Sequence, residues 1–220
     1  LLSVQFLFCQ VLKGKWVIPT IEEGTHKTFE LSFMSDGSII SDELPVSAPN
    51  GSFCEISSGG YLSNFDLQFY FLGNRFCYGN QYFNWNFMGS QTVSDFDPEF
   101  QIINKPGSYN RWYAFYTGSD YDADETNKMF CFTEVYFEDN SWHLSGHNLI
   151  FSPYTGLTSF GITNENLGNR FVYASTPSNS SYLASLKKWT INDQGIVPNS
   201  MEVLVDSDDP ILDPGDFSAY

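Results

Sequence analysis

Basic residues are scarce in this chain, which has 10 Lys and Arg against 26 Asp and Glu and a formal net charge of −16. Such an excess of negative charge repels phosphate backbones, so we do not expect a nucleic-acid partner. The acidity has two interpretations: it keeps an extracellular protein soluble, or part of it binds cations. Long helical patterns are also absent, and 42% of the residues are hydrophobic, so the chain is not a disordered acidic tail.

The chain has no apolar run long enough to cross a bilayer, and we expect no transmembrane span. Its most apolar stretch, residues 1–12, is interrupted only by Ser3, Gln5 and Gln10, and a spanning helix needs about 20 residues. The stretch is similar to the tail of a signal-peptide hydrophobic region. We therefore expect residues 1–12 to be a signal-peptide remnant on an exported protein, with a buried first strand as the alternative.

Cysteine is rare, and its spacing contains no metal or redox motif. The chain has four cysteines without a CxxC pair. If Cys9 is lost with the signal peptide, Cys54, Cys77 and Cys131 remain, which is an odd number. Two alternatives remain for these three residues. Either two of them form a disulfide and the third is a free thiol, or all three are buried thiols.

Sequence motifs of catalysis are missing. Neither a G-x-S-x-G elbow nor a Gly-rich phosphate loop occurs, and these are common signs of nucleophilic or phosphoryl chemistry. His143 and His147 are four residues apart, but the glutamate and the helix of the zinc motif are absent, so we do not expect zinc. The sequence predicts no catalytic residue and assigns no ligand-binding residue.

What the chain does have is aromatic residues, 18% of the total, with 21 Phe and 13 Tyr. Residues 28–34 place Phe29, Leu31 and Phe33 on one face and turn at Asp36-Gly37, which is a two-residue hairpin signal. About a dozen such short strands, with turn signals every ~8–12 residues, predict an all-β protein. No boundary rich in Pro, Gly or Ser argues for two domains.

The tripeptide Asn-Arg-aromatic opens three of the predicted strands. The copies are Asn74-Arg75-Phe76, Asn110-Arg111-Trp112 and Asn169-Arg170-Phe171. The outer two extend to Leu-Gly-Asn-Arg-Phe and lie ~95 residues apart, about twice the length of a propeller blade. Their recurrence predicts copies of one supersecondary unit side by side, and the uneven intervals leave chance recurrence as the alternative.

Several stretches carry a resemblance to a known family. Residues 105–116 contain Lys-Pro-Gly-Ser and then Arg-Trp-Tyr-Ala-Phe-Tyr, which resembles a strand-opening segment of bacterial exported cell-surface β-propeller proteins of the gliding-motility and type IX secretion type. Residues 67–78 and 170–195 resemble other hairpins of that family. The resemblance carries over no functional residues.

The fold and location implied by the resemblance are specific. It implies a partial β-propeller of about three to four four-stranded blades over residues 13–220, truncated at the C-terminus. A β-sandwich is the structural alternative. The resemblance also implies a protein that is secreted or held on the bacterial cell surface.

One acidic stretch has the spacing of a metal site. Asp120, Asp122 and Asp124 alternate along the chain, and oxygen ligands at alternate positions match the start of a calcium loop. Glu125 stands where an EF-hand needs glycine, and Cys131 stands where it needs a bidentate glutamate, so an EF-hand is excluded. A looser Ca²⁺ site and a solvated acidic hairpin loop both stay open.

These observations favour a non-enzymatic exported surface protein whose propeller is a scaffold that presents loops to a protein or glycan partner. The oligomeric state stays open. Tryptophans could form a sugar-stacking platform, but packing between sheets is the stronger interpretation. The four concerned are Trp85, Trp112, Trp142 and Trp189.

The main rival is a glycan-active five-bladed propeller hydrolase. Such an enzyme needs an acid and a base about 5–10 Å apart, here in a central channel. Asp66, Asp95, Asp97 and Glu134 are the carboxylates whose convergence would favour it.

Overall fold

The structure is a computed structural model, and it is all-β. It describes residues 15–22, 25–46, 57–62, 66–73, 75–85, 100–119, 128–146, 148–151, 159–164, 166–177 and 184–205. These residues form strands and turns without a helix, which confirms the predicted fold class. It follows that this part of the chain holds no helix able to span a membrane. The remnant expected over residues 1–12 lies outside the described residues.

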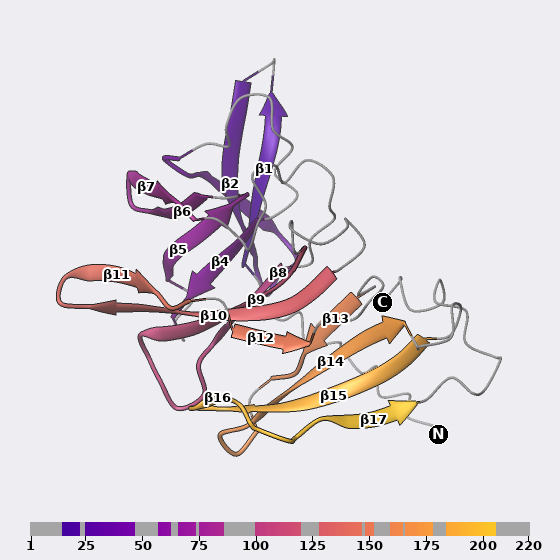
Figure 1. The fold of residues 1–220 in the computed structure, drawn as a ribbon. Helices are drawn as coiled ribbons and strands as arrows, with labels where there is room; N and C mark the ends of the chain where they lie inside the picture. The colour runs from indigo at the N-terminus through magenta and orange to yellow at the C-terminus, as the bar shows by residue number, and fades with distance from the viewer. Residues whose placement is uncertain are drawn as a thin grey trace, which may run out of the picture.

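The strands form four antiparallel sheets that follow the order of the chain (Figure 1). Sheet A consists of β1 (Lys15–Glu22), β2 (Thr25–Phe33) and β3 (Ile39–Glu43). Sheet B consists of β4 (Ser57–Tyr61), β5 (Leu67–Leu72), β6 (Arg75–Tyr78) and β7 (Gln81–Asn84). Sheet C consists of β8 (Phe100–Asn104), β9 (Arg111–Ser119), β10 (Lys128–Glu138), β11 (Ser141–Leu144) and β12 (Asn148–Phe151). Sheet D consists of β13 (Ser159–Ile162), β14 (Arg170–Pro177), β15 (Ala184–Asn192), β16 (Gly195–Ile196) and β17 (Glu202–Val205).

Sheets C and D have five strands because the last strand of each is split in two. β11 and β12 pair with successive parts of β10, and β16 and β17 do the same on β15. A serine marks each break: the Ser145 hydroxyl accepts a hydrogen bond from Glu134 N (2.8 Å), and the Ser200 hydroxyl accepts one from Thr190 N (3.0 Å). The two sheets are therefore copies of one unit with four strand positions.

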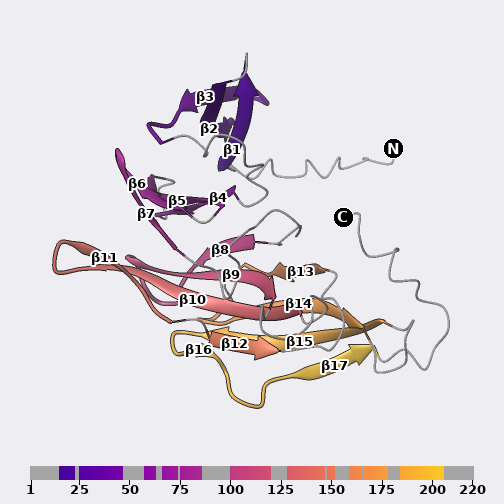
Figure 2. The ribbon, with the colours of Figure 1, turned by 45° about the horizontal axis from the view of Figure 1, so that its top comes forward.

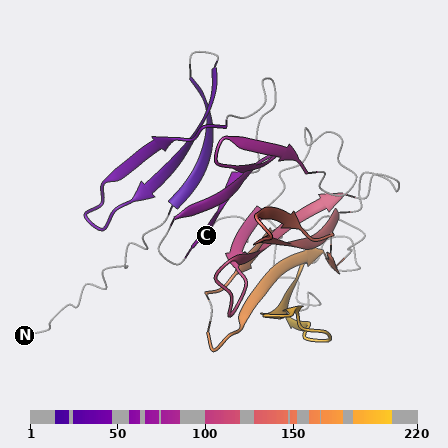
Figure 3. The same ribbon diagram turned by 90° about the vertical axis from the view of Figure 1, so that its left-hand side faces the viewer.

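The sheets stack face to face in chain order, from sheet A in indigo to sheet D in orange and yellow (Figures 2 and 3). Separate apolar clusters fill the A/B, B/C and C/D interfaces. The first strands of neighbouring sheets also lie side by side, since β1 contacts β4 and β4 contacts β8. This stacking is consistent with the predicted partial propeller and also with the β-sandwich alternative.

Strand β9 shows why the sequence contains an unbroken aromatic run. Trp112, Ala114 and Tyr116 belong to the B/C cluster, whereas Tyr113 and Phe115 belong to the C/D cluster. All five are at most 2% exposed. An antiparallel strand with one solvated face alternates apolar and polar residues, and β9 does not alternate because both of its faces are covered.

The hairpin predicted at Asp36-Gly37 is present, but its loop is one residue longer than predicted. The backbone N–H of Met34 donates a hydrogen bond to the carbonyl oxygen of Ser38 (2.9 Å), and the loop between them has three residues. Gly37 ends the loop at a φ of 85°, a left-handed conformation that glycine adopts without strain. Three-residue loops that end in such a residue are the next most common hairpin type after the two-residue ones.

The buried face of β2 is the opposite of the apolar face seen in the sequence. Thr28 and Glu30 are buried, at 0% and 8% exposure, whereas Phe29 and Leu31 are half-buried. Val17, which pairs with Glu30, belongs to the A/B cluster. Sheet B therefore covers the polar face of β2 and leaves the apolar face more open.

The Asn-Arg-aromatic motif opens a strand each time, as predicted, but its copies are not all equivalent. Arg111 and Arg170 begin β9 and β14, the second strands of sheets C and D. Arg75 begins β6, the third strand of sheet B. The two longer copies therefore occupy different strand positions, and the structural repeat relates Arg111 to Arg170.

Candidate functional site

The residues predicted to bind calcium, Asp120, Asp122 and Asp124, lie outside the described residues, so that site stays a prediction. Within the ranges that the structure describes, no group of three or more His, Cys, Asp or Glu is placed to hold a metal ion. His143 instead contacts its own sheet, where its ring stacks on Tyr136 with centroids 5.1 Å apart.

The carboxylates that would favour a hydrolase are only partly described, because Asp95 and Asp97 fall outside the described residues. Asp66 is exposed and lies just before β5 in sheet B. Glu134 lies on β10 in sheet C, where two cations hold its carboxylate. The described carboxylates therefore offer no argument for the hydrolase.

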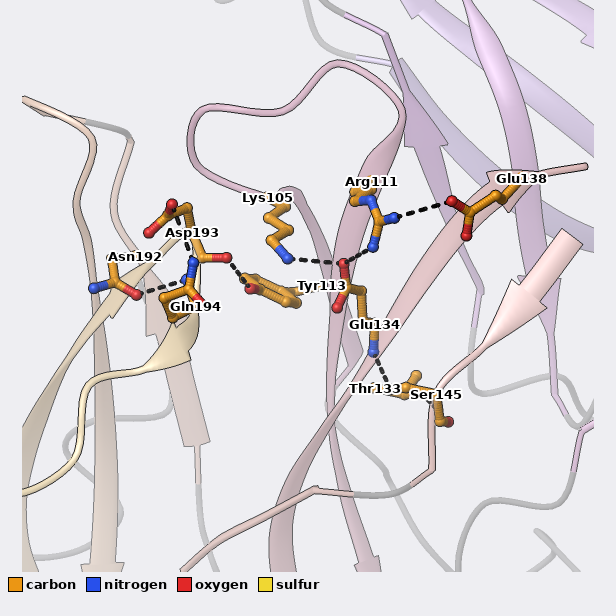
Figure 4. Close-up of polar contacts among 10 residues, drawn as sticks. All are labelled: Lys105, Arg111, Tyr113, Thr133, Glu134, Glu138, Ser145, Asn192, Asp193 and Gln194. Carbon is orange, nitrogen blue, oxygen red and sulfur yellow. Dashed lines mark hydrogen bonds and ion pairs between the residues drawn. The ribbon is translucent and has the colours of Figure 1, made fainter.

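A charged network surrounds Glu134 (Figure 4). Glu134 Oε1 accepts hydrogen bonds from Lys105 Nζ at 2.9 Å and from Arg111 Nη1 at 3.0 Å. Arg111 also forms a 3.8 Å ion pair with Glu138 and lies over the ring of Tyr136, 4.6 Å from its centroid. The hydrogen bond to Glu134 raises the pKa of Arg111, so the guanidinium stays charged. The network fixes both ends of the turn between β8 and β9.

The same face of sheet C is held against sheet D. Tyr113 donates a hydrogen bond from its hydroxyl to the carbonyl oxygen of Asp193 (3.4 Å), in the turn between β15 and β16 (Figure 4). A side chain at Gly195, beside that turn, would come within 3.3 Å of the ring of Phe132. The hydrogen bond joins the turn of sheet D to sheet C, and the absence of a side chain at Gly195 lets the two sheets approach closely.

We expect Glu134→Gln to lower the free energy of unfolding by about 1–2 kcal/mol, because it removes the negative charge that both Lys105 and Arg111 hydrogen-bond. Glu138→Gln is the matched control: Glu138 is 56% exposed at its side chain, and we expect a change below about 0.5 kcal/mol. Urea unfolding of both variants measures the difference. If the two variants lose the same free energy of unfolding, the ion pairs of Glu134 do not stabilise the turn between β8 and β9.

Large apolar side chains are exposed on the turns that precede β9 and β14. Tyr109 is 83% exposed and Leu167 is 93% exposed. The two turns are equivalent, because each joins the first strand of its sheet to the second. Exposed residues of this size, placed on turns that are held by the sheets beneath them, are well suited to contact a partner.

Leu167 also has an unfavourable backbone conformation. Reciprocal hydrogen bonds between Asn166 and Asn169 close a two-residue turn, in which Leu167 has a φ of 52° and Gly168 a φ of 75°. A left-handed conformation costs an ordinary L-residue about 1–2 kcal/mol, and turns of this type prefer Asn-Gly. Neither burial nor local geometry explains a leucine at this position.

A hollow of about 410 Å³ lies where the first strands of three sheets meet. Its walls are residues 15–18 of β1, Gly59 and Tyr61 of β4, and Ile102 of β8. β1, β4 and β8 are edge strands of their sheets, and β4 contacts both of the other two. Trp16, at 60% exposure, supplies the most accessible ring in its wall.

Tyr61 connects three sheets at this hollow. Its carbonyl oxygen accepts hydrogen bonds from Asn104 Nδ2 and Trp112 Nε1 of sheet C, both at 3.0 Å. Burial raises the pKa of its hydroxyl, and the charge of Glu30 in sheet A adds to the shift. Glu30 Oε2 in turn accepts a 3.2 Å hydrogen bond from Lys15 Nζ. Sheets A, B and C therefore meet around one tyrosine.

Trp112, Trp142 and Trp189 pack against other aromatic or apolar residues, as we expected from the sequence. Trp112 and Trp189 are 2% and 4% exposed and belong to the B/C and C/D clusters. Trp142 packs on Phe69 with ring centroids 5.1 Å apart. Trp16, which is 60% exposed, belongs to none of the three clusters.

Two of the cysteines are buried thiols, and Cys54 lies outside the described residues. Cys77 belongs to the A/B cluster and Cys131 to the B/C cluster. Burial raises the pKa of Cys131 to about 12, so this thiol stays protonated and unreactive at neutral pH.

Comparisons of the chain with protein-family models, with curated proteins and with solved structures return no match.

Proposed function

We propose that this chain is part of a non-enzymatic, exported bacterial surface protein, in which stacked blade-like sheets form a scaffold that binds a partner through its turns. Leu167 carries the proposal. The side chain is exposed, apolar and held in a backbone conformation that costs free energy, and strain of this kind gathers at functional sites.

The exposed residues favour a protein partner over a glycan at these turns. Leu167 has no ring to stack on a sugar, whereas an exposed leucine and an exposed tyrosine on equivalent turns of sheets D and C supply apolar anchors for a protein interface. The ion-paired Glu134 beneath the turn before β9 limits the loss of conformational entropy on binding. Calcium bound by Asp120, Asp122 and Asp124 is a further part of the proposal and would order an acidic loop.

The variant Leu167→Asn should have opposite effects on stability and on partner binding. Asparagine tolerates the left-handed conformation, so we expect the variant to be more stable than the wild type by about 1 kcal/mol. Loss of an apolar anchor should at the same time weaken partner binding at least about tenfold. Met201→Ser, at another exposed apolar residue (47% exposed), is the matched control and should bind normally.

The partner is identified first by photo-crosslinking. A benzophenone side chain at position 109 or 167, and at position 201 as a control, is irradiated with the surface proteins of the cells that produce this chain. A protein that is captured only from the two turn positions is then purified, and its dissociation constant is measured for each variant. Unchanged affinity of Leu167→Asn, or release of sugar from a panel of glycans, would contradict the proposal.

A further inference from the structure

We propose that sheet A is a separately opening unit, which leaves sheet B while sheets B, C and D stay stacked. Sheet A is the first sheet of the stack and packs on sheet B through the A/B cluster, whereas sheets B and C each have a neighbour on both faces (Figure 2). Opening uncovers the face of sheet B that carries Tyr70, Leu72 and Cys77. The opening is separate from the turns that carry Tyr109 and Leu167 and does not rest on the proposed function.

Sheet A meets sheet B with a partly polar face. Thr28 and Glu30 are buried on this face, at 0% and 8% exposure, beside the apolar Val17. Neighbours along a strand point to opposite faces of the sheet. Trp16, next to Val17, and Phe29, between Thr28 and Glu30, therefore lie on the face that points away from sheet B. These two rings of sheet A do not strengthen the A/B interface.

Rings do hold the other two interfaces together. Phe69 of sheet B lies against Trp112 of sheet C with ring centroids 5.2 Å apart, and the ring centroids of Phe130 in sheet C and Phe160 in sheet D are 4.8 Å apart. Buried aromatic side chains dominate the stabilisation of packed cores. Separating sheet A from sheet B should therefore cost less free energy than separating the other sheets, and openings of this partial kind occur below global unfolding.

Water can replace the polar contacts across the A/B interface. Glu30 of sheet A interacts with the hydroxyl of Tyr61 in sheet B. The backbone N–H of Val46, which follows β3, donates a 3.2 Å hydrogen bond to the hydroxyl of Tyr70 in sheet B. Hydrogen bonds add little net stability, because water forms equivalent bonds with the same groups once they are exposed. Loss of these contacts therefore opposes the opening only weakly.

The A/B interface is also incompletely packed at one edge. The hollow of about 410 Å³ lies between residues 15–18 of β1 and residues of β4 and β8. Side chains that line a hollow lack protein atoms on one side, so this part of β1 gains less from dispersion contacts than a packed strand does. β1 also contacts β4 without a ladder of backbone hydrogen bonds, because the two strands belong to different sheets. This edge of sheet A is therefore weakly held.

Two buried thiols report on the two interfaces separately. Cys77 belongs to the A/B cluster and Cys131 to the B/C cluster, and both are 0% exposed. A thiol buried in this way reacts with dithionitrobenzoate only after the structure around it opens. The full chain is labelled with Cys9→Ser and Cys54→Ser in place, and mass spectrometry of peptides identifies the labelled cysteine. We expect Cys77 to react at least about tenfold faster than Cys131, with a smaller dependence on urea, because opening of sheet A exposes less surface than unfolding.

Val135→Ala is the decisive variant. Val135 is fully buried in the B/C cluster, and the smaller side chain leaves a cavity there. The cavity destabilises the closed form and the form with sheet A open equally, so the Cys131 rate should rise about tenfold while the Cys77 rate stays unchanged. Glu30→Gln weakens the A/B interface itself and should raise the Cys77 rate about tenfold. Glu43→Gln is its matched control, since Glu43 is 53% exposed at its side chain, and it should raise neither rate more than about twofold.

Two outcomes overturn the proposal. They are equal rates for the two thiols with the same dependence on urea, and an equal rise of both rates in Val135→Ala. Either result means that sheet A leaves sheet B only when the whole stack unfolds. The reagent concentration is kept in the range in which the rates are proportional to it, so that the rates report the population of the open form. The wild type and Val135→Ala keep the test decisive if Glu30→Gln fails to fold.

Discussion

Above pH 10 the protein should lose stability steeply and unfold between about pH 11 and 12. Burial raises the pKa values of four tyrosines and one cysteine, Tyr61, Tyr70, Tyr113, Tyr116 and Cys131. The value for Tyr70 is about 12. Above pH 10 the unfolded chain releases these protons while the folded chain keeps them, so rising pH favours unfolding.

The expected slope is large compared with the stability of a domain. Each tyrosine contributes about 1.4 kcal/mol per pH unit above pH 10, so four contribute about 5 kcal/mol per unit. Typical domains are stable by only ~5–15 kcal/mol. The ionisation of these four tyrosines, followed by absorbance at 295 nm, should therefore coincide with unfolding, followed by circular dichroism.

A single substitution tests whether the buried tyrosines cause the loss of stability above pH 10. Tyr116→Phe removes one of the four buried hydroxyls and should reduce the slope by about 1.4 kcal/mol per pH unit. Tyr109→Phe changes a residue that is 83% exposed and should leave the slope unchanged. Gradual ionisation of all tyrosines near pH 10, without unfolding, would show that the clusters between the sheets do not form.

Gly60→Ala is expected to lower the free energy of unfolding by about 1–3 kcal/mol or more, because it forces overpacking. A Cβ at this position would overlap the ring of Phe69, which is fully buried. Phe69 cannot move away, because it contacts Phe76 and Trp112 with ring centroids 5.0 and 5.2 Å apart. Gly60 is therefore required for sheet B to pack on sheet C.

Gly161→Ala is the matched control, since it changes another strand glycine. A Cβ at Gly161 meets no atom within 4 Å, so we expect a change within about 0.5 kcal/mol. Urea unfolding of both variants measures the contrast. If Gly60→Ala is as stable as Gly161→Ala, then β4 does not lie against Phe69.

Strong local patterns made much of the fold predictable. The aromatic runs of β9 and β10, the turn before Ser141 and the Gly73-Asn74 connection were all recognisable, because turn residues and strand formers alternate there. Leu72 pairs with Arg75, as a two-residue connection requires. The continuous burial of residues 112–116 also follows from the composition of that run.

Strand β4 shows what the sequence could not reveal. Its Ser-Ser-Gly-Gly-Tyr sequence consists mainly of poor strand formers, and adjacent glycines usually predict a loop. The glycines are present because rings from β5 and from Tyr61 lie against the backbone, which is a tertiary cause. A glycine within a strand can signal such close approach, but that signal is recognisable only when the strand is already known.

The candidate site was unpredictable for the same reason. The hollow brings together Lys15, Tyr61 and Ile102, which are far apart in the chain and share no motif. Glu30 joins them through Lys15, although the alternation of β2 predicted Phe29 and Leu31 as its buried face. Packing between sheets placed the polar face inside.

The central claim is that the sheets stack in chain order, with their first strands side by side around the hollow. Nuclear Overhauser spectroscopy tests it most directly. We expect cross-peaks from the Trp112 indole N–H to Tyr61 across the B/C interface, and from Phe130 to Trp189 across the C/D interface, where the ring centroids lie 6.2 Å apart. A folded protein that lacks these peaks, or that shows strong peaks between sheets B and D, would contradict the claim.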